Sequence, residues 1–224
     1  MLSVAHLTLW LRIGGAEQLL VEMARHRDRA RFEWTVIVLD DRGPLADGLE
    51  ADGVRVISLD AGSGFRPRLW KQLAKLFRQE QFDVLHTHDE RPLIYGLPAA
   101  QWAGVPRRVH THHHGQLGDL RWHERFLLRH ASRSAGHFVC VSHDSARYVI
   151  EQGVCAGGVQ TLWNGIDLTR FAYQGPCNNG PIVTVARLIP GKDIANLLRA
   201  AQYVLAAFPQ TRFEIAGEIG RAHV

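Results

Sequence analysis

Short apolar segments that alternate with longer helical ones are the feature of this sequence that most restricts its fold. The apolar segments are rich in Val, Ile and Leu and show little alternation between polar and apolar residues. Such runs are typical of parallel strands that are covered on both faces. The predicted strands are Leu2–Leu9, Trp34–Leu39, Val54–Leu59, Asp83–Thr87, Arg108–Thr111, Phe138–Val141 and Val159–Trp163.

The segments between these strands have the spacing of amphipathic helices. Gly53 and Gly153 each follow such a segment, at the position where a left-handed residue ends a helix. Regular strand–helix alternation predicts an α/β fold with a doubly wound, Rossmann-like parallel sheet. The predicted helices are Ala16–Arg29, Leu45–Asp52, Arg68–Gln79, Pro92–Trp102, Leu120–Ser134 and Asp144–Gln152.

The alternation stops after the seventh strand and then begins again. Residues 174–181 are dense in turn-forming residues and predict a linker between an N-terminal domain, residues 1–173, and a second domain. A strand, a helix and a strand follow within residues 182–217, and three elements are too few to bury a core of their own. They are Ile182–Ala186, Asp193–Ala207 and Arg212–Ala216.

The last residues, 218–224, differ in character from what precedes them. Their reverse translation can be written to match a sequencing-library adapter followed by a stop codon. We interpret them as a non-native tail, and the natural alternative is an ordinary C-terminus.

Composition indicates a packed, mildly basic chain. Hydrophobic residues make up 46% of the 224, charged residues 21%, and the formal net charge is +4. This charge suits phosphorylated ligands, anionic membranes and nucleic acid alike, but without a nucleic-acid reader motif we expect no nucleic-acid partner. The three sparse cysteines are typical of free thiols, and no run reaches the ~18 apolar residues of a spanning helix. These features predict a cytoplasmic protein.

A pair of glycines lies between the first strand and the first helix. Gly14 and Gly15 let the backbone come close to a ligand, and the helix N-terminus behind them favours an anion. The pattern is not G-x-G-x-x-G, so a nicotinamide cofactor is disfavoured. A tight strand-to-helix turn is the structural alternative.

Two histidine-rich segments end the fourth and fifth strands. His86-Thr87-His88-Asp89 and His110-Thr111-His112-His113-His114 fall on the sheet edge where ligands bind. Their spacing matches no zinc signature, and His112 and His113 cannot point to the same side of an extended strand. We therefore favour a histidine that bonds a sugar hydroxyl or transfers a proton over a metal ligand.

Two further strand ends carry polar residues. Ser142, or Asp144, suits the N-cap of the helix after the sixth strand, and no hydrolase motif surrounds it. In the second domain, Arg187 and Lys192 flank a loop that leads into a helix, where two cations would suit a diphosphate. Solvated loop cations are the alternative.

Basic residues recur along two of the predicted helices. Arg121, Arg125, Arg129 and Arg133 are spaced four apart in one helix, and residues 66–78 hold a second basic set. A basic amphipathic helix can lie on an anionic bilayer. The alternative is a solvated face opposite a core-facing stripe.

Taken in order, these motifs resemble those of the family 4 glycosyltransferases of the GT-B fold. The resemblance extends over residues 1–217, and the ordered set is specific although each motif is weak alone. The matching segments are Gly14–Glu17, Asp83–His88, Thr111–Gly115, Val141-Ser142, Asn164-Gly165-Ile166-Asp167, Val185–Asp193 and Phe213–Gly217.

The resemblance implies an enzyme that moves a sugar from a nucleotide-diphosphate donor to a glycan, lipid or small-molecule acceptor with retention. It implies no cofactor and no metal. The basic helices, rather than the resemblance, are the ground for expecting a peripheral contact with the inner face of the plasma membrane. His113 best matches the family's histidine, with His112 its nearest competitor. The implied substrate-binding residues are Gly14, Gly15, Ser142, Asn164, Arg187 and Lys192.

The family's E-x7-E motif, which contacts the donor sugar, is absent from these 224 residues. We therefore expect the chain to be C-terminally truncated and inactive alone. A GT-B sugar-nucleotide epimerase and a non-catalytic GT-B binding module are the two rival interpretations.

Overall fold

The computed structural model describes residues 1–62, 64–114, 121–155, 158–175 and 180–217. Two compact units divide the chain, Met1–Ile166 and Asp167–Val224. Each is described by itself. The predicted linker (174–181) lies within the second unit, its residues 176–179 are outside the described residues, and so is the predicted tail (218–224).

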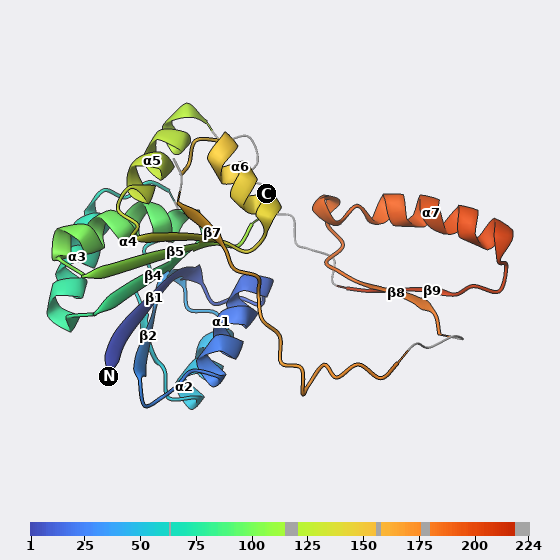
Figure 1. Cartoon of the computed structure of the whole chain (residues 1–224), viewed down its shortest axis with the longest axis horizontal. Helices are drawn as coiled ribbons and strands as arrows, with labels where there is room; N and C mark the ends of the chain where they lie inside the picture. The colour runs from blue at the N-terminus through green and yellow to red at the C-terminus, as the bar shows by residue number, and fades with distance from the viewer. Residues whose placement is uncertain (63, 115–120, 156–157, 176–179, 218–224) are drawn as a thin grey trace. The chain divides into compact units, whose positions relative to one another are not determined.

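The first unit is built on a parallel sheet of seven strands in the order β3-β2-β1-β4-β5-β6-β7 (Figure 1). The order reverses direction between β1 and β4, as in a doubly wound fold, so the predicted fold class is confirmed. The strands are β1 (Leu2–Trp10), β2 (Phe32–Asp41), β3 (Arg55–Ser58), β4 (Val84–His88), β5 (Arg107–His112), β6 (His137–Cys140) and β7 (Val159–Thr161).

Helices cover both faces of this sheet and divide the core in two (Figure 1). α1 and α2 pack on one face over Val36 and Val38, while α3, α4 and α5 pack on the other over Leu7 and Leu85. The helices are α1 (Gly15–Arg25), α2 (Leu45–Ala51), α3 (Arg68–Glu80), α4 (Glu90–Ala103), α5 (Trp122–Ser132) and α6 (His143–Glu151).

Most predicted elements are present, with boundaries that differ by a few residues. Gly53 and Gly153 have φ of 74° and 67°, so both take the left-handed conformation expected after a helix. The first helix ends at Arg25 instead of Arg29, because a turn at Asp28 takes over the backbone bonds of Arg31 and Phe32.

The second unit contains β8 (Ile182–Val185), the 3₁₀ turn Pro190–Lys192, α7 (Ile194–Ala207) and β9 (Phe213–Ala216). β8 and β9 pair in parallel. Among its described residues only Ala201 is buried. A strand pair with one helix thus leaves its apolar side chains exposed, as the small number of elements predicts.

Among the described residues, no helix is both long and apolar enough to cross a membrane.

Candidate active site

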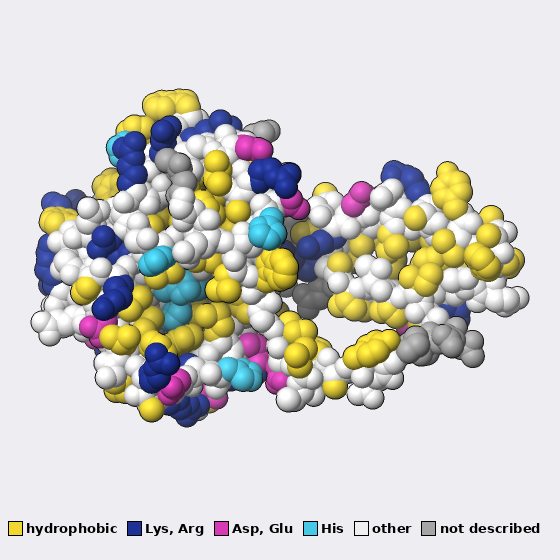
Figure 2. Space-filling model, viewed as in Figure 1, with side chains coloured by type: hydrophobic (Ala, Val, Ile, Leu, Met, Phe, Trp, Pro, Cys, Tyr) yellow, Lys and Arg dark blue, Asp and Glu magenta, His cyan; other side chains and the backbone are white. Residues whose placement is uncertain are grey.

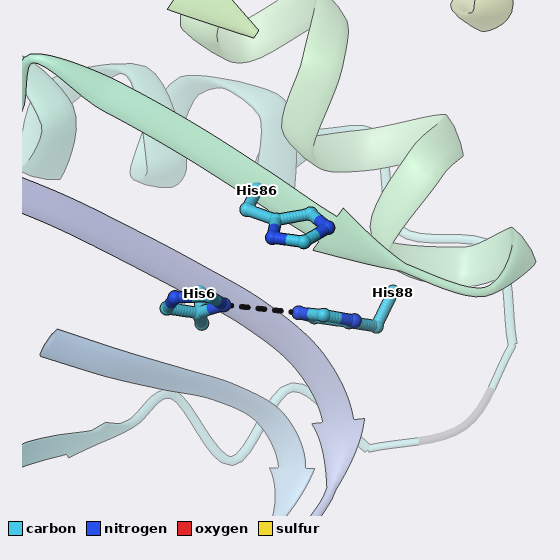
Figure 3. Close-up of side chains that lie close together, drawn as sticks. All are labelled: His6, His86 and His88. Carbon is cyan, nitrogen blue, oxygen red and sulfur yellow. Dashed lines mark hydrogen bonds between the residues drawn. The ribbon is translucent and has the colours of Figure 1, made fainter. Parts of the chain in front are cut away.

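Histidines from three neighbouring strands form a connected row on the α1 face of the sheet. His6 Nδ1 lies 3.1 Å from His88 Nε2, and His88 Nδ1 lies 3.0 Å from His113 Nε2. His86 stands beside this row, in register with His6 (Figure 3). Its Nε2 lies 2.8 Å from Thr111 Oγ1. Since His86 and His88 are two residues apart on one strand, both rings face the same side. The row extends from the core to the carboxyl edge.

Burial keeps these imidazoles neutral. It lowers the pKa of His86 to about 4, with the neighbouring His113 contributing, and the pKa of His113 to about 4, with His114 contributing. The pKa values of His6 and His88 are also well below the ordinary range, chiefly through burial and then through His86. Neutral imidazoles both donate and accept a hydrogen bond, so the row can hold a defined chain of N–H···N bonds at neutral pH.

Two groups of side chains in this region have the proximity that metal binding requires. One ring nitrogen from each of His6, His86 and His88 lies within 4.8 Å of the others (Figure 3). A second group comprises Asp89, Glu90 and His114. In the first group the nitrogens of His6 and His88 are already within hydrogen-bonding distance of each other. The hydrogen-bonded row therefore accounts for that contact without an ion.

His112 points to the opposite side of β5 from His113, as strand alternation predicts. Its side chain is buried, and its Nδ1 lies 3.8 Å from the Glu90 carboxylate at the start of α4. Burial lowers the pKa of His112 to about 4 as well, with His114 and then His113 contributing. His112 and His113 are thus near each other in sequence but have different surroundings.

Asp89 joins the end of β4 to α4 and is central to this edge. Its backbone has φ 62° and ψ −174°, which is rare for a residue with a side chain. Its Oδ1 accepts a bond of 3.1 Å from the backbone N–H of His113, and Oδ2 lies 3.5 Å from His114 Nε2. Burial raises the pKa of Asp89 to about 6; His114 opposes this rise, and Glu90 and Glu17 add to it.

The glycine pair lies at the start of α1, where the sequence predicts it. Gly14 is the N-cap, and a Cβ there would collide with the Glu17 carboxylate. Glu17 Oε1 in turn accepts a bond of 2.9 Å from Trp10 Nε1. A Cβ on Gly15 would meet nothing within 4 Å, so this position leaves space beside the helix N-terminus. Because Glu17 influences the pKa of Asp89, the glycine turn and the ends of β4 and β5 share one electrostatic environment.

Ser142 is the N-cap of α6, one of the two caps that the sequence allows. Its Oγ accepts a bond of 3.0 Å from the backbone N–H of Ser145. Ser145 Oγ donates to the His114 carbonyl at 2.8 Å, which ties the start of α6 to the end of β5. A substrate contact of Ser142 stays a prediction.

The remaining predicted residues lie outside this cluster. Asn164 is exposed in the segment that follows β7. Arg187 and Lys192 belong to the second unit, where both are exposed. Arg187 precedes the short 3₁₀ turn before α7, and Lys192 is the last residue of that turn. Gly115, the last residue of the histidine motif, lies outside the described residues.

A cavity of about 650 Å³ lies elsewhere on the first unit, at the end of β3 and the start of α3. Among its lining residues are Asp60, Phe65 and Arg68, and it includes none of the predicted site residues. The histidine row and Asp89 are the better candidate for the active site than this cavity, because strongly shifted pKa values and strained backbone gather at functional sites.

The predicted site residues did not include four members of this cluster: His6, His86, His88 and Asp89. His88 and Asp89 were visible in the sequence, directly after the fourth strand. His6 had only a weak signal, a polar residue inside a largely apolar strand. Only the register of β1 with β4 brings it to the row.

Comparisons with known proteins agree with this architecture. The model for Glycosyltransferase Family 4 matches residues 13–170. The UDP-Gal:alpha-D-GlcNAc-diphosphoundecaprenol alpha-1,3-galactosyltransferase of Escherichia coli is 25% identical over 97% of this chain and 62% of that protein. The chain thus spans less than two thirds of the length of this curated relative.

Solved structures share the fold. HepE of Anabaena in complex with UDP and glucose superposes with a TM-score of 0.68 at 21% identity, over 99% of this chain and 62% of that one. A glycosyltransferase from Rickettsia africae superposes with a TM-score of 0.66 at 13% identity, over 97% of this chain and 68% of that one. A UDP-GlcNAc 2-epimerase from Neisseria meningitidis bound to UDP-GlcNAc superposes with a TM-score of 0.58 at 13% identity, over 96% of this chain and 65% of that one.

Proposed function

Because this chain belongs to glycosyltransferase family 4, we propose that its protein transfers a sugar from a nucleotide-diphosphate donor to an acceptor with retention. The observation that carries this proposal is the convergence of the glycine turn, Asp89 and His113 on one polar edge of the first sheet. Ligands of doubly wound folds bind at this edge, outside the carboxyl ends of the strands.

We propose a uridine-diphosphate sugar as the donor. The E. coli relative is named for UDP-Gal, and HepE was solved with UDP and glucose. Arg187 and Lys192 are the residues that we propose to neutralise the leaving diphosphate. Negative charge grows on that group as its bond to the anomeric carbon of the donor sugar breaks, and preorganised cations stabilise the transition state.

The proposed acceptor is a lipid-linked or glycan saccharide that reaches the first unit at Gly14, Gly15 and His113. The name of the E. coli relative includes diphosphoundecaprenol, so its acceptor carries both a diphosphate and a lipid. The open position beside Gly15 and the N–H groups of α1 suit an anionic group of this kind. Such an acceptor would place the protein at the inner face of the plasma membrane.

His113 is proposed to bond a sugar hydroxyl as a neutral imidazole. Its Nε2 is occupied by His88, and its Nδ1 is buried without a partner among the described residues. We propose this unsatisfied nitrogen as the atom that bonds the hydroxyl once the substrate is in place. Asp89 fixes the backbone of His113 through the bond to its N–H. Ser142 and Asn164 are proposed as further substrate contacts. No step in this scheme uses a metal, and we expect transfer to continue after chelation with EDTA.

Sugar transfer in the full-length protein tests the proposal. We expect His113→Ala to lower kcat by about 10²–10⁴-fold, since a positioned hydrogen-bonding or proton-transfer group contributes that much. His137→Ala is the matched control, because His137 lies exposed at the amino end of β6, away from the carboxyl edge. Equal rates for the two variants would remove His113 from the mechanism.

The same assay separates the rival functions. An epimerase would convert the UDP-sugar without an acceptor, and a binding module would bind the nucleotide with no turnover. The epimerase structures are alike in fold only, at 13% identity for the Neisseria protein. Unchanged transfer by an Arg187→Ala/Lys192→Ala variant would contradict the proposed diphosphate contact.

A further inference from the structure

The three hydrogen-bonded histidines of the row, His6, His88 and His113, must all donate in the same direction. A neutral imidazole carries one N–H and one bare nitrogen, and burial keeps these three rings neutral by lowering the pKa of each. His88 uses both of its nitrogens, Nε2 towards His6 at 3.1 Å and Nδ1 towards His113 at 3.0 Å. Because it can donate to only one of these neighbours, it must accept from the other, and this orders the protons along the whole row.

Two arrangements of the protons satisfy this condition. In the outward arrangement each ring carries its proton on Nδ1, so His6 donates to His88, His88 donates to His113, and the row ends in an Nδ1–H. In the inward arrangement each ring carries its proton on Nε2, donation runs the other way, and Nδ1 of His113 is left bare. Whether that nitrogen donates or accepts therefore depends on the row as a unit.

The two ends of the row have different surroundings. His6 is 1% exposed, packs against Trp34 with ring centroids 4.0 Å apart, and its Nε2 has no hydrogen-bond partner among the described residues. His113 is half-buried at the carboxyl edge of the sheet. Figure 2 shows histidine side chains at the surface of the first unit, over β1 and β4. A ligand can thus complete the row at the His113 end, whereas the His6 end is closed.

The chemistry of imidazole and the closed end both favour the inward arrangement. A free neutral histidine carries its proton mainly on Nε2, and the inward arrangement gives this tautomer to all three rings. At the closed end, the Trp34 ring packed against His6 can accept weakly from an N–H. Among the described residues, no donor is in hydrogen-bonding reach of a bare His6 Nε2.

We propose that His6 and His88 are positioning residues that hold His113 in its Nε2–H tautomer, so that Nδ1 of His113 can only accept. Such a site requires a ligand group that donates at this point, and it disfavours a fluorine or an ether oxygen, which can only accept. A site built for one hydrogen-bonding group discriminates strongly against an analogue that leaves its buried partner unpaired. The inference rests on the contact between His113 and a sugar hydroxyl in the proposed function.

Nitrogen NMR of the whole chain, isotopically labelled at histidine, tests the direction of the row without any ligand. Long-range proton–nitrogen correlations distinguish a protonated ring nitrogen from a bare one, and single-histidine variants assign the rings. At neutral pH we expect His6, His88 and His113 to carry the proton on Nε2. An Nδ1–H on any of the three would overturn the proposal. A change in the His6 and His88 signals on addition of EDTA would also overturn it, since a bound ion would then hold these nitrogens.

Removal of the closed end should redirect the row. In His6→Leu an N–H on His88 Nε2 would face an apolar side chain, which is unfavourable for a buried donor. We therefore expect the ratio of the Nδ1–H to the Nε2–H form of His113 to rise at least about fivefold. His6→Asn should restore the original tautomer, because its side-chain oxygen can accept at about the position of the lost Nδ1.

His110→Leu is the matched control for this substitution. His110 is fully buried in β5, but its Nδ1 lies 2.9 Å from Thr87 Oγ1 and it does not belong to the row. A His113 tautomer that stayed the same in His6→Leu, or changed as much in His110→Leu, would overturn the coupling. The tautomers of the unmodified chain decide the direction even if His6→Leu fails to fold.

Binding of UDP-sugar analogues to the full-length protein tests the specificity separately. Each hydroxyl in turn is replaced by fluorine, which can only accept, or by an ammonium group, which can only donate. At the position where His113→Ala removes the difference, we expect the amino analogue to bind at least about tenfold more tightly than the fluoro analogue. The reverse order would overturn the proposal. If no position responds to His113→Ala, the sugar contact of the proposed function fails, whereas the direction of the row is decided by the spectra alone.

Discussion

At the scale of single residues, Asp89 carries the most unusual combination of properties in the chain. It adopts a positive φ, is partly buried, and accepts a bond from the backbone of His113. A strained backbone costs about 1–3 kcal/mol and persists only where its surroundings impose it. Here the surroundings are the backbone bond from Asp89 N–H to the Thr111 carbonyl and the start of α4. Such a cost suggests that the position of the carboxylate matters to the site.

We predict that Asp89→Asn stabilises the protein at neutral pH. Burial raises the carboxyl pKa from 3.8 to about 6, so the folded state disfavours the charge, and stability is lost as pH rises through this interval. The difference amounts to about 3 kcal/mol near pH 7 and about 1 kcal/mol near pH 4.5. Asn keeps an oxygen for His113 and tolerates positive φ.

Urea unfolding at both pH values measures this effect. The exposed Asp47 gives the control, since it makes only a surface ion pair with Arg42 and Asp47→Asn should therefore change stability little. A gain from Asp89→Asn that did not shrink on acidification would contradict the role assigned to burial.

At the scale of elements, the position of α4 depends on a close approach to the sheet. A Cβ on Gly96 would collide with Leu7 Cδ2 and lie 2.9 Å from Thr87 Cγ2. These side chains come from β1 and β4, beneath the helix. α4 also continues through Pro98, at which a helix often kinks or ends. Packing against the sheet therefore determines this helix more than its intrinsic propensity does.

Two glycine substitutions test this view. Gly96→Ala should lower the free energy of unfolding by about 1–3 kcal/mol through overpacking, although Ala is the better helix former. Gly48→Ala should raise it by about 0.5–1 kcal/mol, because Gly48 lies within α2 and a Cβ there meets nothing within 4 Å. Chemical denaturation compares the pair, and a stabilising Gly96→Ala would show that α4 can move away from the sheet.

At the scale of the whole molecule, the buried histidines make folding sensitive to acid. A histidine whose pKa is lowered in the folded state binds its proton more readily when unfolded, so stability rises with pH. The full contribution is present above the ordinary pKa of 6.5 and is lost as pH falls towards 4. The raised pKa of Asp89 has the opposite effect, since it makes stability fall as pH rises. Its single contribution is outweighed because six histidines have a lowered pKa: His6, His86, His88, His110, His112 and His113.

We predict that the free energy of unfolding falls steeply between about pH 6.5 and pH 4. His86 alone contributes up to about 3 kcal/mol of this change. His86→Gln should flatten the dependence, whereas replacing the exposed His137 by Gln should leave it unchanged. Urea unfolding across this range gives both slopes, and a flat profile in the unmodified chain would show that the row stays accessible to protons.

Much of the fold was determined by local sequence. The seven predicted strands of the first sheet and the helices between them are present because apolar periodicity and glycine caps act within a few residues. Parallel strands also place their carboxyl ends at one edge, so the sequence could assign His113 and Gly14 to the same side of the sheet. The helix cap at Ser142 could also be predicted, because its hydrogen bond reaches only three residues along the chain, to Ser145.

Tertiary structure alone decided which of these residues touch. The register of β1 with β4 brings His6 to His88, from segments about eighty residues apart, and no local pattern encodes that register. The same holds for the burial that keeps the histidines neutral and for the exposure of Trp122 and Phe126 on α5. Sequence periodicity sets the direction of a side chain relative to its own backbone, whereas its neighbours, its charge state and its contact with water depend on the packing of distant segments.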